Sequence, residues 1–182
     1  PIDQFWKNQP LKPISKAFQH PLQYSGISVE KKILQIQFII KSNQCDYYIL
    51  TALDSIAWLL NLRGNDVQFT PLNLAYALIS QNKKIELFIN KEKVQDIKSE
   101  ICNFANCYPL ESIHNFIKNL SPNISIGIDK KRTPFIFEKI CRDNSLNFKY
   151  LEDPCIYPKA QKNKSELEGA RQANLRDSIS IT

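Results

Sequence analysis

The segment from Leu50 to Asp66 constrains the fold of this chain more than any other stretch. It starts as a strand-like run, continues through the apolar residues Leu53–Asn61 and ends at the charged turn Arg63-Gly64-Asn65-Asp66. A short helix that is apolar on most of its sides is typical of one packed deep within a domain. A strand leading into such a helix predicts an α/β domain, and the turn predicted to stop the helix is a place where polar chemistry can be presented.

The rest of the chain predicts alternating helices and strands. Helices are expected over Ser28–Ile40, Val94–Phe104, Leu110–Leu120 and Pro134–Arg142, the last with Thr133 as its cap, and strands over Tyr47–Thr51, Leu74–Ser80, Ile85–Asn90, Ile124–Ile128 and Asn147–Leu151. The four polar residues Gln81 to Lys84 separate two of these strands as in a hairpin. The fold class is therefore predicted to be α/β, with a mixed β-sheet flanked by helices.

Both ends of the chain differ from this pattern. Residues 1–24 contain Pro10, Pro13 and Pro21, which favour extended backbone, and are predicted to be a linker leading into a domain that spans residues 1–157. Residues 153–158 are expected to be extended. Ser165 to Glu168 match a capping box that opens a polar helix. Residues 158–182 are thus predicted to be a junction and the first helix of another domain, so that the chain is a fragment or a truncated product.

Composition argues against several classes of protein. The net charge of +6 comes from lysines that are dispersed among acidic residues, so a nucleic-acid partner is not favoured. No window reaches the roughly 20 apolar residues that cross a bilayer, which predicts no membrane partner and a cytoplasmic location. The five cysteines are an odd number without paired spacing, which argues against a disulfide framework or a zinc ribbon.

The chain offers few groups from which an active site can be built. Its two histidines, His20 and His114, lie far apart, and no dense run of acidic residues accompanies them, so no metal site is predicted. The four glycines are isolated, which excludes a glycine-rich phosphate loop. No catalytic residue, cofactor or metal ligand is predicted in this chain.

Two blocks of sequence carry a resemblance to a known family. The first is Leu50 to Asp66, extended by Pro71, Tyr76 and Leu87-Phe88-Ile89, and the second runs from Pro158 through Glu168-Gly169 to Arg176-Asp177. In this order and at this spacing, the blocks resemble the three-domain Xaa-Pro aminopeptidases, the aminopeptidase P branch of the pita-bread metallopeptidases. Trp6 with Pro10 is similar to the segment that enters the middle domain of that family.

The resemblance implies a particular place in a larger enzyme. It covers nearly the whole chain and corresponds to the middle domain, a non-catalytic module with a ribonuclease H-like, creatinase-type fold, followed by the start of the catalytic domain. The family releases an N-terminal residue that precedes proline, and it uses two divalent metal ions, with manganese expected, held by the catalytic domain. The implied partners are the missing N-terminal and catalytic domains and a peptide with proline at its second position.

Four residues are candidates for a role in the substrate channel or between domains: Trp58, Arg63, Asn65 and Asp66. Gly64 permits a backbone conformation that a side chain would oppose, Arg63 offers a fork of donors, and Asp66 is placed to hold that guanidinium. The structural alternative is a helix-ending turn with an internal Arg63–Asp66 pair. For the whole chain, the resemblance implies a domain that positions the catalytic domain and shapes access to it. The alternative is a stand-alone basic α/β module that binds nucleic acid or protein.

Overall fold

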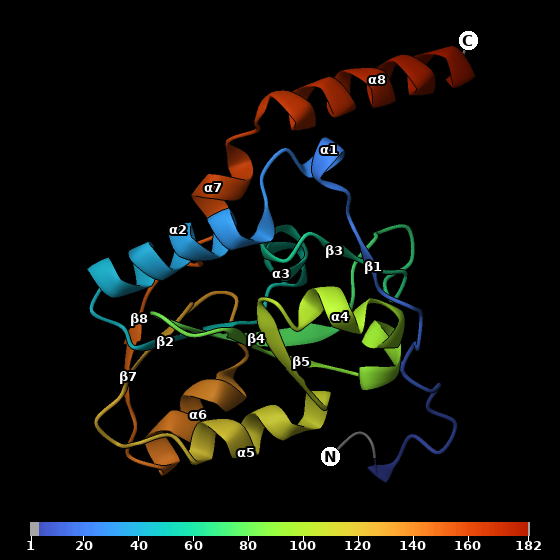
Figure 1. Ribbon diagram of the computed structural model, residues 1–182. Coiled ribbons are helices and arrows are strands. Elements are labelled where there is room, and N and C mark those ends of the chain that lie inside the picture. The colour runs from blue at the N-terminus through green and yellow to red at the C-terminus, as the bar shows by residue number, and fades with distance from the viewer. Residues whose placement is uncertain (1–3, 182) are drawn as a thin grey trace.

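A computed structural model describes residues 4–181, so the first three residues of the predicted linker and the last of the predicted C-terminal helix lie outside the described part. Its centre is a mixed six-stranded sheet in the order β6-β5-β4-β2-β7-β8 (Figure 1). The strands are β2 (Tyr47–Leu50), β4 (Ala75–Ser80), β5 (Ile85–Ile89), β6 (Ala105–Tyr108), β7 (Ser125–Ile128) and β8 (Asn147–Tyr150). Strand β4 is antiparallel to β2 and β5, which confirms the hairpin, and the other neighbours are parallel.

Helices cover both faces of this sheet, as Figure 1 shows. On one face lie α2 (Val29–Ser42), α3 (Leu53–Leu59), the 3-10 helix η2 (Lys91–Ile97) and α4 (Lys98–Ile101). On the other lie the 3-10 helix η3 (Leu110–Ser112), α5 (Ile113–Lys118) and α6 (Phe135–Asp143). The predicted fold class, a mixed sheet flanked by helices, is confirmed.

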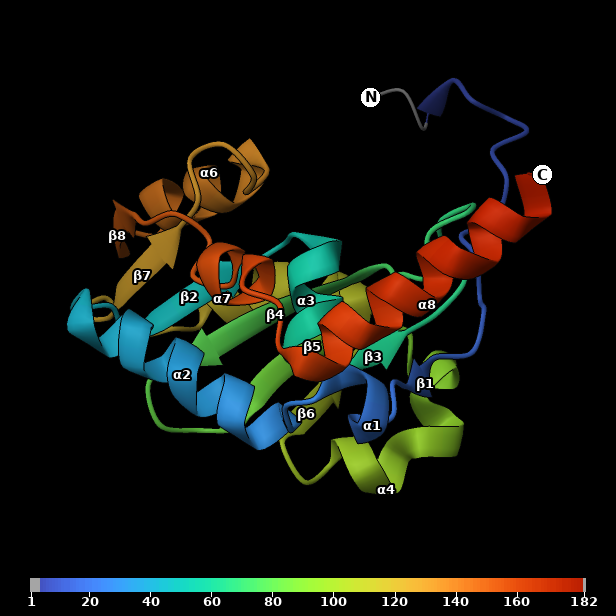
Figure 2. The ribbon, with the colours of Figure 1, turned by 90° about the horizontal axis from the view of Figure 1, so that it is seen from above.

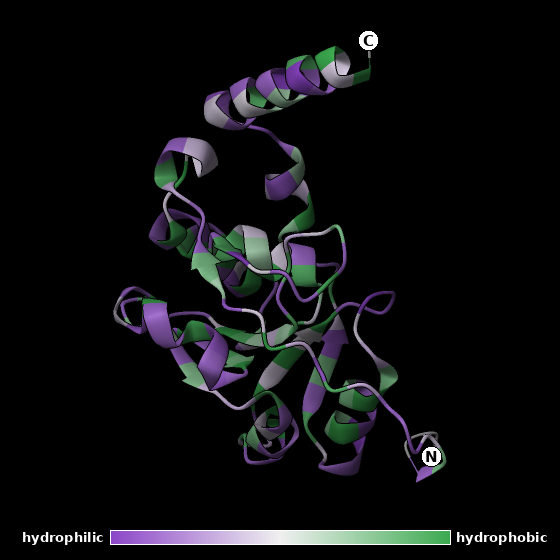
Figure 3. Cartoon of the chain, turned by 90° about the vertical axis from the view of Figure 1, so that its right-hand side faces the viewer, coloured by the Kyte–Doolittle hydropathy of each residue, from purple (hydrophilic) through white to green (hydrophobic). Residues whose placement is uncertain are grey.

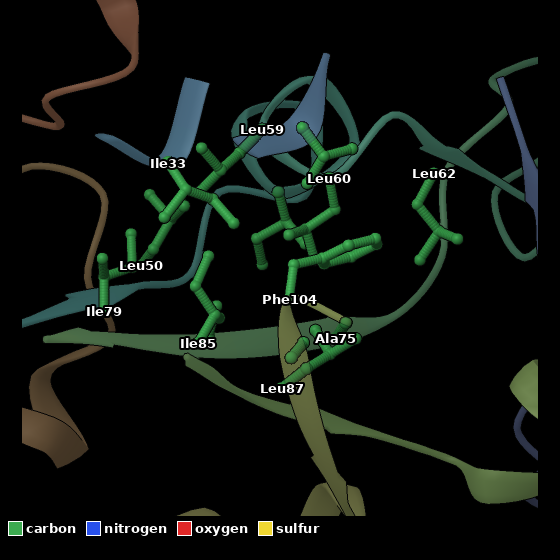
Figure 4. Close-up of a cluster of buried hydrophobic side chains, with 14 of the residues drawn as sticks. Ile33, Leu50, Leu59, Leu60, Leu62, Ala75, Ile79, Ile85, Leu87 and Phe104 are labelled. Atoms are coloured by element: carbon green, nitrogen blue, oxygen red, sulfur yellow. The ribbon is translucent and has the colours of Figure 1, made fainter. Parts of the chain in front are cut away.

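Alternation along the strands divides the core into two clusters. In β4, Ala77 and Ile79 pack toward α3 while Leu78 packs toward α6, because successive side chains of a strand point to opposite faces. The cluster on the α3 face is drawn in Figure 4, where Leu59, Leu60 and Leu62 lie over side chains of the sheet. Each such fully buried aliphatic side chain contributes roughly 1.5–3 kcal/mol.

Helix α2 forms where it was predicted. The hydroxyl of Ser28 accepts a hydrogen bond from the backbone N–H of Lys31, and Ile33, Ile36 and Ile40 bury one stripe of the helix. Gln37, a polar residue of the same helix, is also buried. Its amide donates to the backbone carbonyl of Lys83, so the polar group is satisfied inside the domain.

The prediction of one long helix over Val94–Phe104 is wrong. Helix η2 and α4 are separate short elements, because Ile97, the last residue of η2, has φ −118° and ψ 20°, which is not helical. Strand β6 follows and was not predicted. Its sequence Ala-Asn-Cys-Tyr has no β-branched residue, so only pairing with β5 at the edge of the sheet makes it a strand.

The loop between β7 and α6 corrects a second detail. Thr133 does not cap α6, whose N-cap position is Pro134 and has no side-chain hydrogen bond. The Thr133 hydroxyl accepts from the backbone N–H of Asp129, and the Asp129 carboxylate accepts from the N–H groups of Lys131 and Arg132. These bonds close the loop on itself, so the hydroxyl is not available to the helix.

Segments near the two ends of the chain lie together on the outside of the α3 face. Within the predicted linker, β1 (Phe18–Gln19) pairs antiparallel with β3 (Leu62–Arg63), and α1 (Leu22–Ser25) follows. At the other end, the segment predicted to be extended contains the start of α7 (Ile156–Ala160), after which α8 (Lys164–Ile181) begins. Figure 2 shows α8 crossing above α1 and α3, and its C-terminal turns extend beyond the body of the domain in Figure 1.

The capping box of α8 begins two residues earlier than predicted. The backbone N–H of Asn163 donates to Glu166, and the N–H of Glu166 donates to the side-chain oxygen of Asn163. The Asn163 side-chain amide also donates to the backbone carbonyl of Ser25 at 2.8 Å. This bond connects the cap of α8 to α1. Helix α8 has no buried residue, and Figure 3 shows polar and apolar residues alternating along it.

Two glycines give a matched test of this packing. A Cβ placed on Gly127 would lie 2.7 Å from the Tyr48 ring, whereas one on Gly169 in α8 would meet nothing within 4 Å. We expect Gly127→Ala to lower the free energy of unfolding by about 1–3 kcal/mol through overpacking. Gly169→Ala should leave it unchanged or raise it by up to about 1 kcal/mol through helix propensity. Urea unfolding followed by tryptophan fluorescence measures both, and equal stability of the two variants would contradict the packing around β7.

Candidate functional site

Helix α3 ends before the charged turn that was predicted to stop it. Its last residue is Leu59, and Asn61 takes the left-handed conformation with φ +47° that commonly follows a helix. Arg63 then lies in β3, where it pairs with Phe18 of β1. The stop signal is therefore Asn61, and Arg63 leaves the helix end in an extended strand.

The predicted pair between Arg63 and Asp66 does not form. The side chain of Asp66 is fully buried and makes an ion pair with the buried ammonium group of Lys93. It also accepts from the Ser15 hydroxyl at 2.6 Å and from the N–H of Leu74 at 2.7 Å. Burial by itself would raise the pKa of Asp66, but Lys93 and these hydrogen bonds hold it below its usual value. Asp66 thus fastens the linker to the domain.

Gly64 is required for a different reason from the one predicted. Its φ is not positive, since Gly26 is the glycine with positive φ among the described residues. A Cβ at Gly64 would instead lie 2.0 Å from the Asn73 side chain, so glycine is needed for close approach. Asn65 is exposed, and its backbone N–H donates to Ser15. Neither Asn65 nor Asp66 shares a cavity with Arg63.

Arg63 and Trp58 line a pocket of about 790 Å³ between the body of the domain and α8. One wall is formed by the end of α3, the start of α2 and β3, and a second by His20 and Tyr24 near α1. The first turns of α8 form a third. Four lining residues are cationic and two are acidic: Lys32, Arg63, Lys164 and Arg176 against Glu166 and Glu168. The pocket is therefore basic.

Lys32 is the most deeply buried charge in this pocket, with 1% of the residue exposed. Its ammonium donates to the carbonyl of Trp58 at 2.9 Å and to the side-chain oxygen of Asn61 at 2.7 Å, and it lies 4.6 Å from the centre of the Trp58 ring. The Asn61 amide is held in turn by Ser25 at 3.1 Å and Ile27 at 3.0 Å. Burial lowers the pKa of Lys32 to about 8.

Arg63 extends the same positive region. One of its terminal nitrogens, Nη1, donates to the carbonyls of Ala57 at 2.8 Å and Leu62 at 3.0 Å. Burial lowers the pKa of Arg63, and Glu166 opposes this shift. Burial, followed by repulsion from Arg63 and Lys32, also lowers the pKa of His20. Within residues 4–181, no carboxylate oxygen lies within 4.0 Å of Lys32 or Arg63.

A second polar cluster lies where the parallel strands β2 and β7 end, the usual place for a ligand in an α/β sheet. Asp153 is buried there and accepts from the Ser55 hydroxyl at 2.5 Å and from the N–H of Cys155 at 2.8 Å. Asp129 accepts from the N–H of Asp153, and Lys159 forms an ion pair with Asp54. The cluster uses its carboxylates to fasten residues 153–160 to the start of α3.

The described residues do not form a metal site. Between residues 4 and 181, no three His, Cys, Asp or Glu side chains are grouped so that they could hold an ion. The described helices also include none that is long and apolar enough to span a membrane.

Comparison with known proteins identifies the family. The family model for the creatinase/prolidase N-terminal domain matches residues 8–166. The chain belongs to this family. The predicted resemblance is thereby confirmed, and the creatinase-type fold with it.

Curated members of the family with similar sequences are much longer. The probable Xaa-Pro aminopeptidase P of Laccaria bicolor is 30% identical over 187 residues, which cover 99% of this chain and 28% of that protein. That of Paracoccidioides lutzii is 31% identical over 194 residues, which cover 100% of this chain and 31% of the relative. The chain spans about 30% of the length of the curated relatives it matches.

Two solved structures show the same fold. X-prolyl aminopeptidase from Caenorhabditis elegans, a cytosolic enzyme with a di-nuclear active site, superposes with a TM-score of 0.89 at 24% identity, over 99% of this chain and 30% of that one. The Xaa-Pro dipeptidase from Bacillus anthracis gives 0.58 at 13% identity, over 85% of this chain and 44% of the other.

Lys32 and Asn61 belong to the pocket but were not among the predicted site residues. A signal for Lys32 was present, because it lies three residues after Val29 and four before Ile36, on the buried stripe of α2. A lysine on such a stripe must find acceptors inside the domain. Asn61 had a weaker signal, since asparagine is one of the few residues that readily take a left-handed conformation after a helix.

The pKa of Lys32 predicts an unusual dependence of stability on pH. The folded chain releases this proton near pH 8 and the unfolded chain near 10.5, so the unfolded chain binds more protons between these values. The free energy of unfolding therefore gains a contribution as pH rises through this window, by about 1–2 kcal/mol after allowance for solvent screening. We expect the free energy of unfolding of the wild type, minus that of Lys32→Met, to rise from about pH 7.5 to 10.

Urea titrations at several pH values measure this difference. Lys31→Met makes the same change at an exposed neighbour and serves as the control. If the Lys32→Met difference is flat or falls over this range, the ammonium of Lys32 is not held in the buried setting described above.

Proposed function

We propose that this chain is the non-catalytic middle domain of a Xaa-Pro aminopeptidase P, which releases the N-terminal residue preceding proline. The observation that carries this proposal is the pattern of coverage: relatives with that name match 99–100% of this chain, yet the match covers 28–31% of each. The remaining length of such a parent has room for an N-terminal and a catalytic domain. A cytosolic location, as for the Caenorhabditis elegans enzyme, belongs to the same proposal.

Catalysis is assigned to the part of the parent outside this chain. The described residues provide no grouped ligands for a metal ion, whereas the C. elegans enzyme has a di-nuclear active site. Two divalent ions, with manganese expected, are therefore proposed for the catalytic domain of the parent. The domain boundaries follow the same proposal, with residues 1–157 as the middle domain and 158–182 as the junction.

The contribution of this domain is proposed to be positional. Residues 153–160 are fixed to α3 by the Asp153–Ser55 hydrogen bond and the Lys159–Asp54 ion pair, and Asn163 ties the start of α8 to α1. Helix α8 is thereby held at both its entrance and its first turn. A catalytic domain continuing from α8 receives a defined orientation, and the pocket beside α8 forms part of the approach for a peptide.

Loss of the Lys159 tether tests this role. In the parent enzyme, Lys159→Met removes the ion pair with Asp54 and a 3.3 Å contact with the Ser55 hydroxyl. We expect kcat/KM for a Xaa-Pro peptide to fall about 10-fold to 100-fold, because small displacements of a catalytic unit have effects of this size. Bound metal, measured by mass spectrometry, should stay unchanged.

Lys139→Met provides the matched control, since it breaks an exposed pair with Asp143 that lies one helical turn away on α6. It should leave kcat/KM as in wild type. Undiminished activity of Lys159→Met, at equal stability, would refute the positional role.

The chain by itself should not cleave peptides. Incubation of the 182-residue chain with a Xaa-Pro peptide and added Mn²⁺ is expected to release no N-terminal residue, because the described part of the chain lacks a grouped ligand set. Liquid chromatography with mass detection measures the products. Proline-specific cleavage that appears with added Mn²⁺ and is lost when a chelator removes it would overturn the assignment of catalysis to another domain.

A further inference from the structure

The pocket beside α8 contains two cations that no carboxylate of the described chain neutralises. Lys32 and Arg63 both line it, and no carboxylate oxygen lies within 4.0 Å of either. Burial is the main cause of the lowered pKa of Lys32, which Glu166 opposes and Arg63 reinforces. A buried charge in a protein is normally paired, so the buried Lys32, with the half-buried Arg63 in the same pocket, points to an anion that completes the site.

Lys32 and Arg63 also have hydrogen-bond donors without an acceptor. The ammonium of Lys32 has three N–H groups, and the carbonyl of Trp58 and the side chain of Asn61 take two of them. Only the Nη1 group of Arg63 is bonded, to Ala57 and Leu62, so Nε and Nη2 have no partner among residues 4–181. Nε and Nη2 are one edge of the guanidinium fork, the edge that can bind a carboxylate through two parallel bonds.

The carboxylate of Glu166 does not supply the missing anion for Lys32 and Arg63. It lines the pocket, but its Oε2 atom accepts from the backbone N–H of Asn163 in the capping box of α8. Its position at the start of the helix is therefore fixed by the cap, beyond ion-pair distance from both cations. Glu166 reduces the positive potential without occupying the donors.

The volume of the pocket and its aromatic lining indicate the size and character of the rest of the ligand. A volume of about 790 Å³ is within the range of about 300–1,000 Å³ usual for small-molecule sites, and it far exceeds the space that one acidic side chain fills. The Trp58 ring and the stacked pair of His20 and Tyr24, with ring centres 5.9 Å apart, contribute flat surfaces. These features suit a small molecule with a carboxylate and a partly apolar body.

We propose that this pocket binds the C-terminal carboxylate of a short peptide, with Arg63 and Lys32 as its anchors. The proposal rests on the proposed function, because a peptide is the carboxylate-bearing substrate that such a parent enzyme encounters. It makes the middle domain a contributor to peptide-length selection: a peptide whose terminus reaches Arg63 gains charge-assisted hydrogen bonds that a longer one lacks.

Binding to the 182-residue chain gives a direct test. Trp6→Phe leaves Trp58 as the single tryptophan, whose ring lies in the pocket, so its fluorescence reports occupancy. The probes are Ala-Pro-Ala, the same tripeptide as its C-terminal amide, and acetate. We expect the free acid to bind at least 10-fold more tightly than the amide and than acetate.

Two variants locate the interaction. Arg63→Gln should weaken binding of the free acid at least 10-fold and leave that of the amide unchanged. Arg142→Gln removes the same charge on α6, where Arg142 pairs with Glu138, and should bind as the parent chain does. Circular dichroism verifies that both variants fold, and the comparison of acid with amide requires no variant at all.

Three outcomes would overturn the proposal. If the acid and the amide bind equally, the pocket does not recognise a carboxylate. If the tripeptide and acetate bind equally, the pocket does not recognise a peptide body, and its occupant is an acidic side chain of the parent. No binding at about 10 mM removes the ligand altogether. The result of the Lys159→Met experiment does not depend on these binding results. If the tripeptide does not bind but Lys159→Met lowers kcat/KM as expected, only this inference is refuted.

Discussion

The hydrogen-bond network around Asn61 is the constraint on which the rest of this structure depends. Its left-handed backbone ends α3 and turns the chain into β3, while its side chain accepts from Lys32 and donates to Ser25 and Ile27. Its backbone carbonyl accepts from His20. One residue therefore joins α3, α2 and the segment around α1. A buried network of this kind is stable only when every member is satisfied, which fixes the geometry of the pocket wall.

Helix α3 connects this network to the other polar cluster of the domain. At its first turn, Asp54 and Ser55 bind Lys159 and Asp153 of the exit segment. At its last turn, Trp58 supplies a carbonyl and a ring to Lys32. The apolar sides of the helix are buried between these ends, so it behaves as a rigid spacer. The orientation of α8 and the shape of the pocket are consequently set by the same seven-residue helix.

Sequence patterns predicted the parts of the fold that depend on local periodicity. The buried strands, α2 and α6 were found because their apolar residues recur at strand or helix spacing. Strand β6 was missed because Ala105-Asn106-Cys107-Tyr108 has little strand propensity and forms through pairing with β5. The partners of Asp66 were missed for a related reason. Ser15 and Lys93 lie 51 and 27 residues away, a choice made by tertiary packing that no local pattern records.

The candidate site shows the same division. The sequence singled out Trp58 and Arg63 together with Asn65 and Asp66. Trp58 and Arg63 share a pocket, whereas Asn65 and Asp66 contact the linker. The separation follows from the end of β3 at Arg63, after which the chain bends and Ser15 and Lys93 hold Asn65 and Asp66. Arg63 is left facing Lys32 without a carboxylate, although Asp66 is only three residues away and is committed to Lys93. The charge imbalance of the pocket is therefore built into the fold: the acid nearest to Arg63 in the sequence is used elsewhere, and the donors of Arg63 stay directed at a ligand.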